Sequence, residues 1–76
     1  MTPSQFDFIL RGFCRRRPFQ PFILEFVSSA QLVVLHPEAI GPKGGIYVLR
    51  RPDGGYVAFA SESVSRVLDI PPATAT

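Results

Sequence analysis

The stretch Val57-Ala-Phe-Ala-Ser-Glu-Ser-Val-Ser-Arg-Val-Leu-Asp-Ile70 decides how the rest of the chain is interpreted. It begins as an alternating strand, breaks at the small polar residues Ser61-Glu62-Ser63, and resumes as a second short strand. A break of this length suits one tight turn or a 3₁₀ turn and is too short for a loose loop. The two strands are therefore expected to meet at a sharp angle, as at the last corner of a small β-barrel.

Length and composition favour one small folded domain. The chain has 76 residues, of which 46% are hydrophobic and seven are Phe, so disorder of the whole chain is not expected. Its net charge of +2 is only mildly basic. Cys14 is the only cysteine and His36 the only histidine, which leaves no internal disulfide and too few ligands for a Cys/His zinc site. We expect neither a metal nor a cofactor.

Residues 3–14 are predicted to form a helix. Thr2 is a plausible N-cap and Pro3 suits the first helical position, with Ser4 as the alternative cap. Pro18 ends the helical pattern. One apolar stripe follows the i, i+3, i+4, i+7 spacing of a helix face, and it consists of Phe6, Ile9, Leu10 and Phe13.

The remainder of the chain is predicted to form five strands, at residues 22–27, 31–36, 46–51, 56–60 and 64 or 65 to 70. Asp53-Gly54 marks a hairpin turn between the third and fourth strands. Residues 37–45 are expected to be a loop in which 37–40 can form one helical turn and place Ile40 in the core. The second strand is apolar on both faces, so one of those faces should meet a helix or a partner.

These elements predict an α+β fold, in which an N-terminal helix caps a small, strongly bent, five-stranded antiparallel β-barrel. Residues 1–70 form this single domain, and residues 71–76 are expected to be a flexible tail. No internal repeat and no domain linker is evident.

The order of one helix, two hairpins and a short last strand resembles that of small Sm-like and SH3-like barrels. The chain also resembles a set of short uncharacterised bacterial proteins that share a proline- and phenylalanine-rich lead-in and a His-Pro after the second strand. Here these are Pro18-Phe19-Gln20-Pro21-Phe22 and His36-Pro37, and the resemblance extends from Thr2 to Ile70. It implies the barrel fold and carries no activity. An RNA pocket of the Sm type is not expected, because strand two lacks an Asp.

No arrangement typical of an enzyme is found. A nucleophile needs a base within hydrogen-bonding reach, and nothing in the sequence places Cys14 beside His36. The six carboxylates are scattered over predicted surfaces. The segment Gly41-Pro42-Lys43-Gly44-Gly45 lacks the full phosphate-loop motif and precedes a strand, so we interpret it as a flexible surface loop. We therefore expect a non-enzymatic protein with no catalytic residues.

The basic residues form the most informative group. Phe8, Arg11 and Arg15 lie at i, i+3 and i+7, which makes a second helix stripe that Arg16 and Arg17 extend. Arg50 and Arg51 end the third strand. Arginines beside an aromatic ring can bind phosphates and stack a base, so these seven residues are the candidate nucleic-acid-binding site. The alternative is a solvated helix end with dipole-matched charges and Phe8 at the edge of the core.

The function predicted first is a small interaction or assembly module that binds a protein partner or forms a homo-oligomer. The alternative is a module that binds RNA or single-stranded DNA through the arginine stripe. The exposure of Phe8 distinguishes the two, because a buried Phe8 cannot stack a base. No apolar run approaches the ~18 residues of a membrane span, and the N-terminus lacks a signal pattern, so a cytoplasmic protein without membrane contact is expected.

Overall fold

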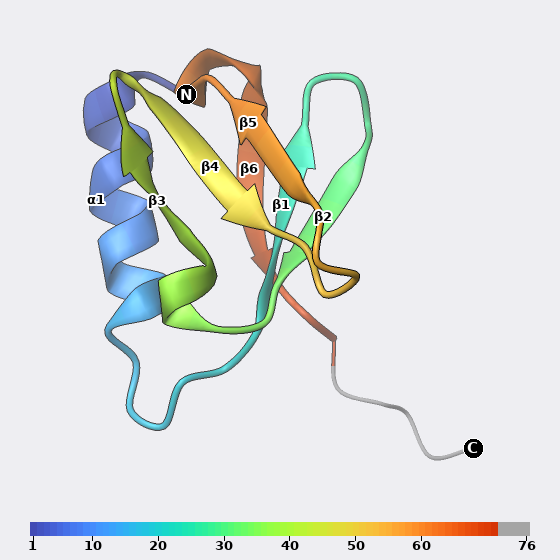
Figure 1. Ribbon diagram of the computed structural model, residues 1–76. Helices are drawn as coiled ribbons and strands as arrows, with labels where there is room; N and C mark the ends of the chain where they lie inside the picture. Colours follow the sequence, from blue (N-terminus) through green and yellow to red (C-terminus); the bar gives the residue numbers. More distant parts are fainter. Residues whose placement is uncertain (72–76) are drawn as a thin grey trace.

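A computed structural model gives the conformation of residues 1–71, in which one helix and six strands follow one another along the chain (Figure 1). The elements are α1 (Pro3–Cys14), β1 (Phe22–Phe26), β2 (Gln31–Val34), β3 (Ile40–Lys43), β4 (Ile46–Arg50), β5 (Tyr56–Phe59) and β6 (Val64–Asp69). Two 3₁₀ turns, η1 (Pro37–Ala39) and η2 (Ser61–Ser63), precede β3 and β6. Of the expected tail, Pro71 is exposed, and residues 72–76 lie outside the described part of the chain.

The predicted five-stranded barrel is wrong, in both its Sm-like and its SH3-like form. The described strands form two separate three-stranded antiparallel sheets, ordered β2-β1-β6 and β3-β4-β5, and neither sheet closes on itself. The α+β class and the N-terminal helix are confirmed. Each sheet keeps two edge strands, whereas a closed barrel would have none.

The additional strand, β3, comes from the segment that we expected to be a flexible loop. Gly44 and Gly45 have φ values of +59° and +87°, so both central residues of the β3–β4 turn occupy the region that a tight two-residue hairpin requires. Pro42 cannot donate a ladder hydrogen bond, and it is tolerated because β3 is an edge strand. The segment is therefore a hairpin.

The corner at Ser61-Glu62-Ser63 is a 3₁₀ turn, which is one of the two forms that the sequence predicts. The Ser63 hydroxyl donates to the Ala60 carbonyl at 2.6 Å, which tightens the turn. The Val27 amide donates to the Ser63 carbonyl at 2.9 Å, so the corner is also tied to the end of β1. After this corner the chain leaves the sheet of β5 and pairs β6 with β1, so the corner joins two sheets and does not close a barrel.

Helix α1 begins where its sequence indicates. The Thr2 hydroxyl accepts from the Gln5 amide at 3.2 Å, and the Gln5 side-chain oxygen accepts from the Thr2 amide at 3.1 Å, which together make a capping box. Pro3 occupies the first helical position. Thr2 is therefore the N-cap, and the alternative at Ser4 is wrong.

The inward face of α1 joins the two sheets. Phe6 is fully buried, and its ring meets Tyr47 of β4 edge-on at a centroid distance of 4.7 Å and Phe59 of β5 at 5.9 Å. Nearer the C-terminal end of the helix, the Phe13 ring lies 5.0 Å from the ring of Phe22 in β1. Leu10 is also buried between these contacts. The opposite face of α1 is left in solvent, and it carries the candidate site.

The outer face of the β2-β1-β6 sheet is partly apolar and partly charged. Val33 and Leu35 remain 37% and 38% exposed, so α1 does not cover the second apolar face of strand two. At the other end of the sheet, the Glu25 carboxylate accepts hydrogen bonds from Arg66 at 2.5 Å and from Gln31 at 3.0 Å. These bonds, first that from Arg66 and then that from Gln31, hold the pKa of Glu25 below its usual value.

Candidate functional site

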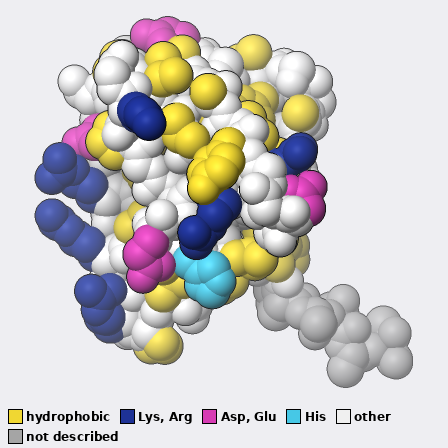
Figure 2. Space-filling model, viewed as in Figure 1, with side chains coloured by type: hydrophobic (Ala, Val, Ile, Leu, Met, Phe, Trp, Pro, Cys, Tyr) yellow, Lys and Arg dark blue, Asp and Glu magenta, His cyan; other side chains and the backbone are white. Residues whose placement is uncertain are grey.

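Basic side chains gather along the helix side of the molecule. Figure 2 shows a column of dark blue Lys and Arg side chains at the left edge, where Figure 1 places α1. Arg11 of α1 and Arg15, the C-cap that follows the helix, are both exposed. The stripe predicted from the i, i+3 and i+7 spacing therefore exists as a surface feature.

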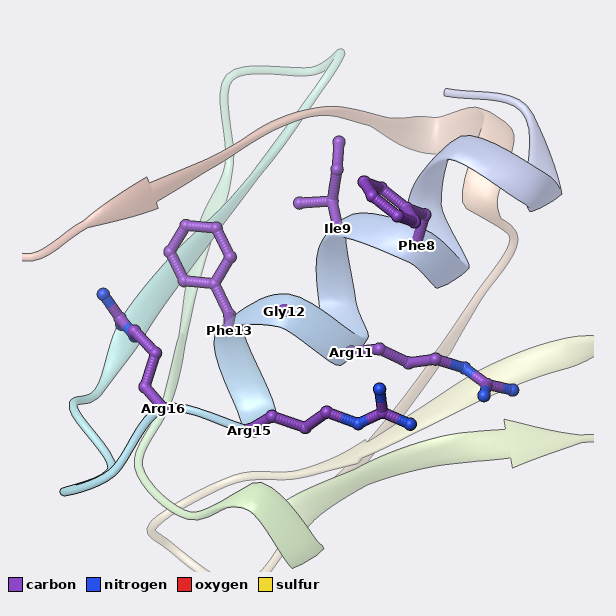
Figure 3. Close-up of a pocket in the computed structure, with 7 residues that line it drawn as sticks. All are labelled: Phe8, Ile9, Arg11, Gly12, Phe13, Arg15 and Arg16. Atoms are coloured by element: carbon purple, nitrogen blue, oxygen red, sulfur yellow. The ribbon is translucent and has the colours of Figure 1, made fainter.

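Beside this column the outer face of α1 carries a groove of about 410 Å³, here called the α1 groove (Figure 3). Gly12 lies at its floor, and apart from the adjoining helix backbone no atom comes within 4 Å of the position that a Cβ would occupy there. Phe8, Ile9 and Phe13 supply its apolar walls. Arg11, Arg15 and Arg16 supply its basic rim. In the close-up, Arg11 and Arg15 extend away from the helix on the side opposite Ile9.

Phe8 is the most exposed large apolar side chain of the groove, with 80% of its surface accessible. The interpretation that placed Phe8 at the edge of the core is wrong. Single exposed apolar residues are ordinary on protein surfaces. Phe8, however, adjoins the partly exposed side chains of Ile9 and Phe13, so the three form one apolar surface along the groove.

The arginines of the stripe differ in the ion pairs and hydrogen bonds that they form with other groups of the protein. Arg11 Nε lies 2.9 Å from the carboxylate of Asp7 in the same helix. Arg15 forms no ion pair among the described residues. Arg17 donates only to the Arg16 carbonyl, at 3.3 Å. Arg15 and Arg17 are therefore the arginines of the stripe with most freedom to meet an external anion.

Arg16 has a structural role in addition to its place on the rim. Its Nη1 donates to Asp69 Oδ1 at 2.6 Å, and its Nη2 donates to the Gln20 carbonyl at 3.0 Å. The guanidinium also lies over the Phe13 ring, 4.6 Å from its centroid. Arg16 thus ties the end of α1 to the end of β6 and to the segment that leads into β1.

Arg50 and Arg51 do not belong to the α1 groove. They line a second hollow beside η1 and the β4–β5 turn, with none of the helix residues around it. Arg51 lies 3.5 Å from Asp53 in that turn. Of the seven residues predicted as one nucleic-acid surface, four line the α1 groove, two line this second hollow, and Arg17 lines neither.

The Cys14 thiol, considered above as a candidate nucleophile, is half-buried. Partial burial raises the pKa of the Cys14 thiol, which lowers the fraction of reactive thiolate at neutral pH. Among residues 1–71, no cluster of three His, Cys, Asp or Glu side chains could hold a metal ion. The helix in this part of the chain is too short and too polar to cross a membrane.

Comparisons with protein-family models, with curated proteins and with solved structures found no match. The function is therefore inferred from the two surface sites. Sequence reasoning missed Gly12, although a signal was present. A glycine inside a helix costs about 1 kcal/mol relative to alanine, so its presence between Phe8 and Phe13 indicates a need for space.

Proposed function

We propose that this protein is a non-enzymatic interaction module that binds a protein partner in the α1 groove. The partner is a segment with one large apolar side chain, flanked by Asp or Glu. The observation that supports this is the open floor at Gly12, between the apolar walls of Phe8 and Phe13 and below a basic rim. A volume of about 410 Å³ lies within the common range for ligand pockets.

The apolar contacts and the charged contacts of the proposed complex have different physical roles. Burial of one Leu- or Phe-sized side chain against Phe8 and Phe13 contributes about 1.5–3 kcal/mol. Arg15 attracts acidic flanking residues, which speeds association and selects between partners more than it adds affinity. A partner with these features should keep part of its affinity at high salt.

Selection of peptides from a displayed random library on the immobilised protein tests the proposal. Peptides that combine one large apolar residue with neighbouring acidic residues should be enriched. The blocking variant is Gly12→Leu, which fills the groove floor while replacing glycine with a better helix former. The matched control is Ser4→Leu, which adds the same side chain to an exposed helix position that does not line the groove.

Enriched peptides should bind Ser4→Leu as they bind the unmodified protein and should lose at least tenfold in affinity for Gly12→Leu, about 1.4 kcal/mol. Peptides that bind Gly12→Leu undiminished would place the interaction elsewhere and refute the groove. Selection of basic or purely polar sequences would refute the stated partner chemistry.

A second candidate function is the binding of single-stranded nucleic acid, and the 80% exposure of Phe8 beside Arg11 and Arg15 favours it. Such binding must weaken with salt. The slope of log affinity against log salt should be about −1.4 if Arg15 and Arg17 alone contact phosphates, and about −2.8 if Arg11 and Arg16 join them.

Fluorescence anisotropy with a labelled single-stranded oligonucleotide separates the two functions. Replacing Arg15 and Arg17 with Gln should flatten the salt slope, whereas Phe8→Ala should weaken binding without changing it, because stacking releases no ions. Arg66→Gln removes a positive charge from β6, at a position that does not line the α1 groove, and is the control for loss of charge. A protein-binding module predicts no oligonucleotide binding at physiological salt.

A further inference from the structure

The second hollow, here called the η1 hollow, lies where β2 leads into η1 and where β4 turns into β5. It has a volume of about 370 Å³. Its basic side chains are His36 from the segment before η1, Arg50 at the end of β4, and Arg51 directly after it. Leu35 and Pro52 contribute apolar wall. The fold thus brings His36 beside two adjacent arginines that follow it by 14 and 15 residues in the sequence.

No carboxylate of the described residues lines this hollow. Figure 2 shows the cyan histidine directly beside a dark blue side chain in the lower centre of the viewed face. Arg50 forms no ion pair within residues 1–71, so its guanidinium is available to an external anion. Glu38 lies in an adjoining hollow that shares Arg50, and it forms no ion pair there within 4.0 Å.

Arg51 is held in place by the turn that follows it. Its amide donates to the Gly55 carbonyl at 2.7 Å, and its carbonyl accepts from the Gly54 amide at 3.0 Å. Asp53 lies 3.5 Å from its guanidinium and accepts from the Gly55 amide at 2.8 Å. The guanidinium lies across Gly55, since a Cβ there would come within 3.0 Å of Nη2. Arg51 therefore loses less side-chain conformational entropy on binding a ligand than an arginine without such contacts would lose.

We propose that the η1 hollow binds the phosphate group of a small phosphate monoester, with Arg50 and Arg51 as the principal donors and His36 as a third. Guanidinium groups match the geometry of phosphate oxygens and bind them through paired hydrogen bonds. A monoester carries close to two negative charges at neutral pH, which suits the guanidinium of Arg50, unpaired within residues 1–71, beside that of Arg51, which Asp53 contacts only at 3.5 Å. Leu35 and Pro52 are placed to contact the organic part of the ligand.

Three phosphate compounds test the chemistry of the site. Their binding is monitored through the backbone amide NMR signals of Ala39, Arg51 and Gly54 at constant ionic strength. Phenyl phosphate should bind more tightly than inorganic phosphate, because its ring adds apolar contact. Dimethyl phosphate, a diester with one negative charge that resembles a nucleic-acid backbone, should bind most weakly. Equal binding of all three probes would overturn the assignment to a monoester.

Two variants locate the site. Arg50→Gln should weaken phenyl phosphate binding by about five- to tenfold, as expected for loss of one charge-assisted contact at an exposed site. Arg66→Gln removes the same charge from the other sheet and should leave the affinity within a factor of two. Amide spectra of both variants establish that the fold persists. Equal weakening by both variants, or none by Arg50→Gln, would show that the hollow is not a specific phosphate site.

Discussion

Replacement of Phe6 by Ala should remove the central contact between α1 and the β3-β4-β5 sheet. The ring is fully buried and meets Tyr47 and Phe59 edge-on. Truncation of a buried Phe to Ala costs about 3–5 kcal/mol, which includes the lost transfer energy and the cavity. A domain of 76 residues has a total stability of about 4–11 kcal/mol, so this one change can remove about a quarter or more of it.

The assay is urea unfolding at 25 °C followed by far-UV circular dichroism. Phe8→Ala is a matched control, because it truncates the same side chain two positions along the same helix, where it is 80% exposed. Phe8→Ala should change the free energy of unfolding by no more than about 0.5 kcal/mol. If Phe6→Ala does not fold, Phe6→Leu keeps most of the volume, loses the aromatic pairs, and should cost about 1–2 kcal/mol.

Equal losses of stability for the two Ala variants would refute the orientation of α1. A cost below about 1 kcal/mol for Phe6→Ala would show that the helix is not packed on the sheet as described, since no fully buried Phe is removed so cheaply.

Further predictions follow from single features of the fold. Gly44→Ala should cost about 1–2 kcal/mol in urea unfolding because its φ of +59° disfavours a side chain, whereas Gly41→Ala, with open space at its Cβ and no positive φ, should be neutral. Arg16→Gln should cost about 1 kcal/mol and Arg15→Gln almost nothing, since only Arg16 ties α1 to other elements. The folded-state pKa of Glu25 is lowered, so its contribution to stability should be fully present above the unfolded value of about 4.3 and be lost as the pH falls through the folded value. Glu25→Gln should therefore have a lower free energy of unfolding than the unmodified protein at neutral pH, and this difference should shrink in acid. The expected homo-oligomer should appear in sedimentation velocity at high micromolar concentration, and a single monomeric species would contradict it.

Local signals in the sequence predicted the local structure well. The helix begins at its capping residue and ends at Cys14, as the stripe and Pro18 indicate. The five predicted strands and the corner at Ser61-Glu62-Ser63 agree with the structure within one or two residues. Strand β3 was missed because Gly41 and Pro42 interrupt the alternation that marks a strand. The Gly44-Gly45 pair was the available signal, because adjacent glycines favour a tight hairpin turn.

Pairing between distant segments could not be predicted in the same way. Alternation shows which face of a strand is apolar, but not which strand lies beside it. β6 pairs with β1, and Asp69 of β6 lies opposite Phe22 of β1, which is more than forty residues earlier in the chain. This pairing determines that two sheets form. The corner between β5 and β6 is compatible with either arrangement. The barrel was inferred from element order, which two open sheets satisfy equally well.

The sequence predicted which residues could form the candidate site, but not how the structure arranges them. The spacing of Phe8, Arg11 and Arg15 placed them on one helix face, and the structure agrees. Helical periodicity contains no information about Arg50 and Arg51, which occupy another surface. It also could not show that Arg16 is already engaged by Asp69. Such contacts depend on where β6 ends relative to α1.

The two faces of α1 separate the tests of stability from the tests of binding. Phe6 faces the sheets and Phe8 faces solvent, so changes at Phe8 or Gly12 can abolish binding while the core stays intact. Water-exposed apolar area at Phe8 and Ile9 contributes nothing to folding, and only contact with another molecule can recover its transfer energy. A glycine at the groove floor likewise lowers helix stability by about 1 kcal/mol relative to alanine. Gly12→Ala should therefore raise the stability of the protein, and a loss of binding in this more stable variant could not be ascribed to unfolding.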